Sequence, residues 1–202
     1  MTDPKFRRTQ QDGIRLAHVA PLNEFIDELQ EQDGRGWSPH IAPIYGGVAA
    51  EMVNILRDPG PMTNSGLGGS GLLCLENNDD TAERLANLLD GAGIGVDRTV
   101  PWNAYPWYIN RKPGAAELEA AVKPLHGYLA RLPRLRVVIL NGGEAQDVWR
   151  RLEKRHGVPR GIEKIPTYHT SRQALIGPPE VRASREAHLR AAFARAATVL
   201  AT

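Results

Sequence analysis

Three polar residues, Asp58, Asn103 and His169, each stand at or just after the end of a predicted strand. The short apolar run Met52 to Leu56 is stopped at once by the turn Pro59-Gly60-Pro61, which leaves Asp58 at its carboxyl end. A carboxylate can stabilise positive charge or orient water, an imidazole can donate to a developing anion, and an amide both donates and accepts. The spacing therefore indicates a site where charge develops, provided that the fold brings the three residues together.

Each of the three residues also has an ordinary structural explanation. Asp58 can cap a turn, Asn103 can support a loop through its side-chain amide, and His169 can be a buried histidine with its hydrogen bonds satisfied. The recurrence of polar side chains at three equivalent strand ends favours a common site over three separate structural roles.

The rest of the pattern predicts strands that alternate with helices. Strands are expected at 51–57, 100–103, 136–141 and 163–168. Helices are expected at 21–32, from the cap Asp79-Asp80-Thr81 to Gly91, at 115–131 with an interruption at Pro124, at 143–155 and at 182–200, while 1–20 reads as an irregular basic lead-in and 34–43 as loop. Such alternation predicts a three-layer α/β/α sandwich with a central, mainly parallel four-stranded sheet. Parallel strands place their carboxyl ends on one edge, so the three polar residues can converge there.

Length and composition fit one domain. The chain has 202 residues, of which 42% are hydrophobic, and this is enough for a single core. No apolar run is long enough to span a membrane, and the first residues are polar and lack the core of a signal peptide. The single cysteine, Cys74, excludes an internal disulfide and a cluster held by several thiolates. We therefore expect a cytoplasmic protein, associated with the nucleoid if it is bacterial.

The charge is unevenly distributed along the chain. Residues 1–130 carry 11 Lys and Arg against 17 Asp and Glu, whereas residues 131–202 carry 14 against 6. A basic carboxyl-terminal third of this kind can form a surface that faces phosphates. The alternative is that these arginines lie on separate solvated faces of helices.

Two motifs and the residue between them form an ordered set. A strand is followed by Arg57-Asp58-Pro59-Gly60-Pro61, the next strand ends in Trp102-Asn103, and a later one leads into His169-Thr170-Ser171-Arg172-Gln173-Ala174-Leu175. In this order the chain resembles the uracil-DNA glycosylase superfamily over about residues 40–178. That family has Asp-Pro or Asn-Pro after its first strand, and His-Pro-Ser before a loop that wedges into DNA.

The chain departs from the family's pattern at several positions. Gly60 stands where the main bacterial uracil enzyme has a Tyr that excludes the methyl group of thymine, and Thr170 replaces the usual Pro of the second motif. Asp58 precedes Pro-Gly-Pro, where the single-strand-selective monofunctional branch has Asn. The cysteines of the iron–sulfur branches are absent, so the resemblance is to a divergent member without such a cluster.

The resemblance implies a monomeric glycosylase that hydrolyses the N-glycosidic bond of uracil in DNA, which initiates base excision repair, and that uses no metal or cofactor. Asp58 would stabilise the cationic sugar and activate water, and His169 would donate to O2 of the leaving base. Asn103 would read O4 and N3–H of the base. The other expected base-binding residues are Arg57, Gly60 and Leu75, and the expected DNA-binding residues are Ser171, Arg172, Gln173 and Ser70, the last in a glycine-rich stretch at 66–71 whose backbone N–H groups could bind phosphate.

Two further hypotheses stay open. No lysine stands beside the motifs to form a Schiff base, so lyase activity is not expected. A module that grips uracil or abasic DNA with little turnover is the first alternative, favoured by Arg57 beside the acid and by Thr170. The second is a hydrolase of small nucleotides, which would act on free nucleosides and show no salt-dependent binding to DNA.

Overall fold

The protein is an α/β structure built on one parallel sheet. The computed structural model describes residues 1–157 and 161–202. Its main sheet has four parallel strands in the order β4-β2-β5-β6. The strands are β2 (Met52–Leu56), β4 (Thr99–Asn103), β5 (Val137–Asn141) and β6 (Glu163–Thr167). The predicted sandwich is confirmed, and the sheet is parallel throughout.

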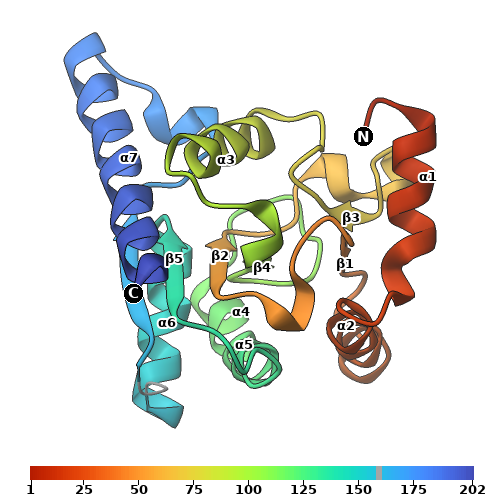
Figure 1. Cartoon of the computed structure of the whole chain (residues 1–202). Helices are drawn as coiled ribbons and strands as arrows, with labels where there is room; N and C mark the ends of the chain where they lie inside the picture. The colour runs from red at the N-terminus through yellow and green to blue at the C-terminus, as the bar shows by residue number, and fades with distance from the viewer. Residues whose placement is uncertain (158–160) are drawn as a thin grey trace.

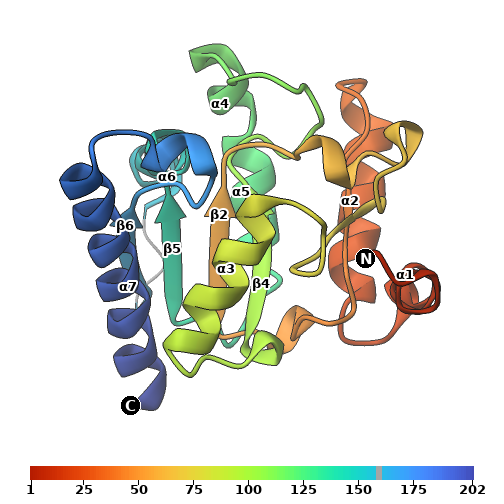
Figure 2. The same ribbon diagram turned by 90° about the horizontal axis from the view of Figure 1, so that it is seen from above.

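Helices cover both faces of this sheet (Figures 1 and 2). One face carries α3 (Asp80–Gly91) and α7 (Pro179–Ala201). The other carries α4 (Ala115–Ala120), α5 (Val122–Leu129) and α6 (Gly143–His156). Beyond the β4 edge lies α2 (Ala20–Asp33), and beyond that α1 (Pro4–Asp12), as Figure 2 shows. The carboxyl ends of the central strands therefore stay uncovered by helices along one edge.

Large aromatic side chains fill the space between the sheet and the α5 layer. Trp102 stacks on Tyr128 with ring centroids 4.0 Å apart, and both side chains are almost completely buried. The hydroxyl of Tyr128 donates to the carbonyl of Pro101 at 2.9 Å, which satisfies its buried polar group. The β4 strand is thereby fixed to the layer below it, up to the residue before Asn103.

The break in the predicted helix at 115–131 falls at Ala121, between α4 and α5. Pro124 has no N–H group to donate to the carbonyl of Ala120, so one continuous helix would lose a hydrogen bond there. In the observed arrangement Pro124 lies in the first turn of α5, where an N–H has no helical partner in any case.

The prediction that residues 1–20 are irregular was wrong. Asp3 caps α1 by accepting from the backbone N–H of Lys5 at 2.8 Å, and Pro4 occupies the first helical position. A short 3-10 helix, Gly13–Arg15, follows. Helix α1 docks through polar groups, because Arg7 donates to the carbonyls of Gly68 and Gly69. It therefore lacks the periodic apolar residues by which amphipathic helices are predicted.

A second, two-stranded parallel sheet was also missed. It pairs β1 (His40–Ile41) with β3 (Leu72–Leu73), and β1 lies in the stretch 34–43 that was predicted to be loop. Strands of two residues are too short to show an alternating pattern. This small sheet holds the end of the glycine-rich loop beside the main sheet.

Glu51 joins the amino-terminal edge of the sheet to the end of α7. Its carboxylate, with only 14% of the side chain exposed, is bonded by Arg98 and by Arg134 at 3.0 Å, and Arg136 lies 3.9 Å away. Arg98 and Arg136 also donate to the carbonyl of Leu200, at 2.9 and 3.1 Å. The hydrogen bond from Arg98 holds the pKa of Glu51 below its usual value. One carboxylate thus ties the starts of β2, β4 and β5 to the last turn of the chain's longest helix.

Replacement of this carboxylate should destabilise the protein in a pH-dependent way. We expect Glu51→Gln to lower the free energy of unfolding by about 1.5–3 kcal/mol at pH 7, the value of a hydrogen bond to a charged group. A carboxylate with a depressed pKa stabilises the fold above its unfolded pKa, so the difference from wild type should shrink as the pH falls below 4.5 and Glu51 is protonated.

Urea unfolding at pH 7 and at pH 3 would measure this difference. Glu28→Gln is the matched control, because Glu28 is more exposed and lies 3.9 Å from its one partner, Arg131. Equal effects of the two substitutions at pH 7 would contradict the role given to Glu51.

Candidate active site

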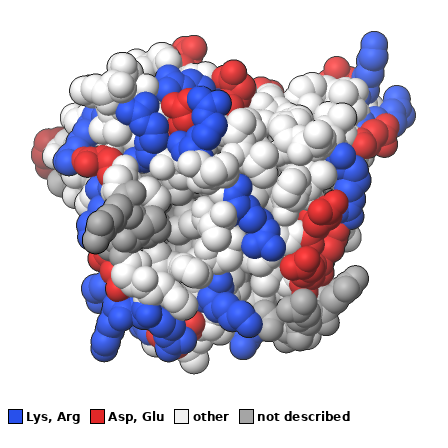
Figure 3. All heavy atoms as spheres, turned by 60° about the horizontal axis from the view of Figure 1, so that its bottom comes forward, with Lys and Arg blue, Asp and Glu red and all other residues white. Residues whose placement is uncertain are grey.

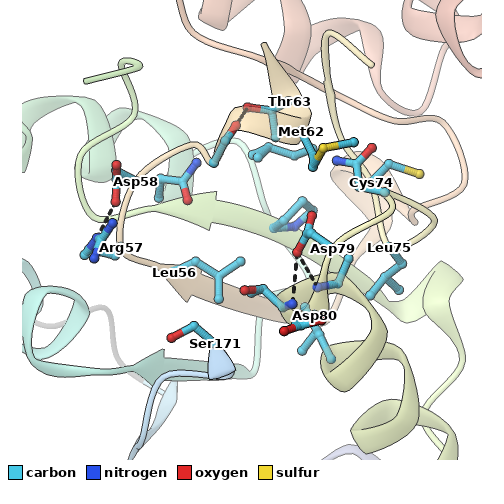
Figure 4. Close-up of a pocket in the computed structure, with 18 of the residues that line it drawn as sticks. Leu56, Arg57, Asp58, Met62, Thr63, Cys74, Leu75, Asp79, Asp80 and Ser171 are labelled. Atoms are coloured by element: carbon cyan, nitrogen blue, oxygen red, sulfur yellow. Dashed lines mark hydrogen bonds and ion pairs between the residues drawn. The ribbon is translucent and has the colours of Figure 1, made fainter. Parts of the chain in front are cut away.

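A cavity of about 500 Å³ opens at the carboxyl edge of the main sheet (Figure 4). It is lined by the loops after β2 and β6. The carboxyl ends of the strands form the upper edge of the sheet in Figure 2. All but one of the residues predicted for the site line it: Asp58, His169, Asn103, Arg57, Gly60, Leu75, Ser171, Arg172 and Gln173. The structure therefore brings these side chains together, while their roles remain predictions.

The parallel register explains this convergence. Leu56, the last residue of β2, is aligned with Asn103, the last residue of β4. The pairing continues past the strand ends, because Ala104 and Tyr105 donate to the carbonyls of Leu56 and Arg57 at 2.7 and 3.0 Å. Asp58 follows directly, and its position is fixed by main-chain hydrogen bonds before any side chain takes part.

Asp58 is a buried carboxyl group with one cationic partner. Only 3% of its side chain is exposed, and its Oδ1 accepts from Nε of Arg57. Burial raises the pKa of Asp58 above its usual value, and the neighbouring guanidinium opposes that shift without cancelling it. The group can therefore change between the acid and the carboxylate at a pH closer to neutral than an exposed Asp would.

His169 is a neutral imidazole of defined tautomer. Its Nδ1 accepts from the backbone N–H of Ser171 at 3.0 Å, so the ring proton is on Nε2. Burial, together with the positive charge of Arg57, lowers the pKa of His169 to about 4. At neutral pH the ring carries no charge and can offer a single N–H donor to an occupant of the cavity.

Gly142 makes room for this histidine. It precedes α6 with a φ of +89°, in the left-handed region that favours glycine. A β-carbon at this position would lie 3.1 Å from Cβ of His169 and 3.5 Å from its ring. The close approach of backbone to ring restricts where the imidazole can lie.

Asn103 supplies a buried amide with unused capacity. The residue is 2% exposed, and within residues 1–157 and 161–202 no group accepts a hydrogen bond from its Nδ2. Leaving such a donor without a partner costs about 1–3 kcal/mol. A ligand carbonyl placed against Asn103 would remove that cost, which makes the amide a point of recognition.

The opposite wall contains residues that the sequence reasoning did not assign to the site. Asp79 caps α3 as predicted, accepting from the N–H groups of Thr81 and Ala82 at 2.9 Å, and it also lines the cavity. Asn77 lies on the same wall, and its buried Oδ1 has no donor among the described residues. Burial raises the pKa of the Cys74 thiol to about 11, so it is protonated. Figure 4 shows Cys74, Leu75 and Asp79 across the cavity from Asp58.

A signal for this wall was present in the sequence. Asp79 and Asp80 follow the short strand β3, although at a greater distance along the chain than Asp58 follows β2. They read as a helix cap, which they are, and the strand before them is too short to be predicted. The rule that ligands bind at strand ends was therefore not applied to them.

The predicted phosphate-binding role of Ser70 and the glycine-rich loop was wrong. Ser70 is 3% exposed, lies outside the cavity lining, and its hydroxyl accepts from the N–H of Leu72 at 3.1 Å. Each N–H from Gly66 to Gly71 donates to an acceptor inside the same loop. No backbone donor of this stretch is therefore left for a phosphate, and the glycines serve a compact turn in which backbone packs against backbone.

Part of the basic carboxyl-terminal third is paired with acids from elsewhere in the chain. Many of its arginines pair with acids from the first 130 residues: Arg131 with Glu28, Arg134 and Arg136 with Glu51, and Arg151 and Arg155 with Glu119. Figure 3 views the molecule from the side of α5 and α6, where basic and acidic groups lie interspersed around an uncharged centre. Part of the charge asymmetry along the sequence is thus used for internal ion pairs.

The loop after β6 is held at both ends while its middle is exposed. Nη1 of Arg84, from α3, donates to the carbonyl of Thr170 at 2.6 Å, and Nη1 of Arg185, from α7, donates to that of Ala174 at 2.9 Å. Arg172 and Gln173 lie between these anchors on a short 3-10 helix, exposed beside the mouth of the cavity. Their side chains are therefore accessible at the mouth of the cavity, while the DNA-binding role expected of them remains a prediction.

A scan against protein-family models and a search of curated protein sequences found no match for this chain. No helix in the described part of the chain is long and apolar enough to cross a bilayer. Over residues 1–157 and 161–202, no three His, Cys, Asp or Glu side chains are grouped so that they could hold a metal ion.

The state of His169 can be tested directly. We expect its ring to titrate with a midpoint near pH 4 and to carry its proton on Nε2 at pH 7, because burial disfavours the imidazolium and Ser171 occupies Nδ1. Nitrogen-15 NMR of the labelled imidazole, compared with His169→Gln for assignment, would measure both. A midpoint near 6.5, or protonation on Nδ1, would contradict this description of the site.

Proposed function

We propose that the protein is a monofunctional DNA glycosylase of the uracil-DNA glycosylase superfamily that hydrolyses the N-glycosidic bond of uracil. The observation that carries the proposal is the meeting of Asp58, Asn103 and His169 in one cavity at the carboxyl edge of the sheet. A buried carboxyl, a neutral N–H donor and an unpaired amide are the groups that this hydrolysis needs. Their order along the chain is that of the family's motifs.

The reaction breaks the bond between C1′ of the sugar and N1 of the base. The bonding electrons leave with the base, so positive charge grows on the sugar and negative charge on O2. Ionised Asp58 would stabilise the sugar and accept a proton from the attacking water, whose oxygen bonds to C1′. The Nε2–H of His169 would donate to O2 without transferring its proton, as in an oxyanion hole, where one donor is worth roughly 10²–10³ in rate.

Asn103 would provide the choice of base. Its Nδ2 would donate to O4 of uracil and its Oδ1 would accept from N3–H. Cytosine presents an amino group in place of O4 and has no proton on N3. Both hydrogen bonds would then fail, at a cost of about 1–3 kcal/mol each in a buried site.

The proposal is tested by incubating the protein with oligonucleotides that contain uracil, hypoxanthine, xanthine or thymine, followed by alkaline cleavage of abasic sites. We expect strand cleavage at uracil only after alkali, and we expect Asp58→Asn to lower the single-turnover rate by at least about 10² through lost charge stabilisation. Gel retardation of the same oligonucleotides should still detect binding by the variant. Single-turnover rates within threefold of wild type would remove Asp58 from the mechanism.

The rate should also depend on the protonation of Asp58. Because burial raises the pKa of Asp58, the wild-type rate should fall on the acid side at a pH above 3.8, the ordinary value for an aspartic acid. This limb of the pH–rate profile should be absent from any residual activity of Asp58→Asn. Protonation of His169, with a pKa of about 4, would persist in the pH profile of Asp58→Asn and so be told apart from that of Asp58.

The absence of a side chain at Gly60 predicts a base pocket that accepts substituents on the base. A β-carbon built on Gly60 meets no atom within 4 Å, and the backbone there is extended, so a side chain is free to enter. Substituents at C5 of uracil should therefore be accepted by the wild type. Gly60→Tyr should reduce excision of 5-hydroxymethyluracil relative to uracil by about 10–200-fold. Equal discrimination by wild type and variant would show that another residue, such as Met62, closes this wall.

One observation favours a second function, binding without turnover. Arg57 is bonded to Asp58, and a neighbouring positive charge reduces the stabilisation that the carboxylate can offer to a cationic sugar. A binding module would retain uracil or abasic DNA in gel retardation and release no base in the same assay. Base release above that of Asp58→Asn decides for the glycosylase.

A further inference from the structure

Among the described residues, Arg57 is the one cation bonded to the buried carboxyl of Asp58. Its Nε donates to Oδ1 of Asp58, and 38% of its side chain stays exposed at the cavity. Within residues 1–157 and 161–202, no group accepts a hydrogen bond from its Nη1 or Nη2. The guanidinium is therefore anchored at one corner and has two nitrogens free to donate.

The charge of Arg57 acts on the other ionisable groups around the cavity. After burial, it is the main cause of the low pKa of His169. Glu144 lies in the first turn of α6, and Nζ of Lys112 is 2.9 Å from its Oε1. Burial opposes ionisation of Glu144, but the positive charges of Lys112 and Arg57 hold its pKa below the usual value. Arg57 thus lies among Asp58, His169 and Glu144, with Lys112 already committed to Glu144.

We propose that Arg57 is an anion-binding residue of this site, which holds an anionic oxygen of the substrate through Nη1 and Nη2 while Asp58 fixes its Nε. The inference rests on the proposed function. The anionic oxygen has two possible sources: a phosphate beside the flipped nucleotide, or O2 of the departing base. A planar guanidinium presents paired donors that match either one.

Anchoring by Asp58 makes such a fork effective. A free arginine loses side-chain entropy when it binds, whereas one held through Nε already has its remaining donors oriented. The bound anion in turn would partly neutralise the positive charge of Arg57 that acts on Asp58. The carboxylate would then regain its influence on the cationic sugar when substrate is present.

The experiment compares Arg57→Met and Arg57→Lys with wild type in three measurements. These are the single-turnover rate at saturating enzyme, the release of uracil against 5-fluorouracil, whose anion is more stable, and the salt dependence of binding to an oligonucleotide with a 2′-fluorinated uracil nucleotide that resists cleavage. Arg131→Met is the matched control, because Arg131 is 34% exposed, has one acidic partner and lies outside the cavity. Its rates and affinities should equal those of wild type.

If Arg57 binds the departing base, Arg57→Met should lower the saturating rate for uracil by about 10² and that for 5-fluorouracil by clearly less. If it binds a phosphate, the saturating rate should be kept, while affinity falls about tenfold and the magnitude of the log–log salt slope drops by about 0.7–0.9. In both cases Arg57→Lys should restore part of the loss, since it keeps the charge without the fork.

Three results would overturn the proposal. Rates, affinities and salt slopes within threefold of wild type would show that Arg57 binds no anion, and a faster Arg57→Met would make it only a brake on Asp58. An equal loss of rate for both bases with unchanged binding would also assign it a merely structural role. If the wild type releases no base at all, the proposed function itself fails. If the wild type is active and Arg57→Met behaves like it, only the role given to Arg57 fails.

Discussion

The carboxylate of Glu51 joins the starts of β2, β4 and β5, and the carboxyl edge of the sheet depends on how these starts are aligned. Arg98 and Arg136, the residues before β4 and β5, meet it from either side, and the main chain of Glu51 pairs with both. Parallel strands of equal length that start in register also end in register. The ion pairs of Glu51 stabilise this start of the sheet, and the main-chain register carries the alignment to the carboxyl edge, where the loops line the cavity.

Burial shifts the pKa values of the two ionisable groups of the site in opposite directions, and the shift of His169 serves the proposed reaction. It raises the pKa of Asp58 and lowers that of His169, because each neutral form is favoured in a dry environment. A neutral imidazole can donate to a forming anion without first holding a positive charge near Asp58. The hydrogen bond from Ser171 leaves the proton on the nitrogen that is free to reach the cavity.

Features encoded by local pattern were predictable, and features that depend on polar contacts across the chain were not. The apolar run of β5 and the polar ends of β2 and β4 led to the sheet and to the joint placement of Asp58 and Asn103. Helix α1 escaped prediction because it docks through Arg7 and Gln11 onto carbonyls some sixty residues away. The ion pairs of the basic residues were not predicted, because a sequence shows the sign of a residue and not its partner, such as Glu51 or Glu119.

The hydrogen bonds from Arg98 and Arg136 to the end of α7 affect how the chain folds as it leaves the ribosome. Arg98 and Arg136, which stand just before β4 and β5, are synthesised long before Val199 and Leu200, whose carbonyls they bind. Contacts of such long sequence separation form late, because the intervening chain must first be ordered. Until α7 has been synthesised, Arg98 and Arg136 at the amino edge of the sheet can therefore pair only with Glu51 and water. Completion of the domain coincides with the arrival of its last turn, and a stalled nascent chain would expose the α7 side of the sheet to other polypeptides.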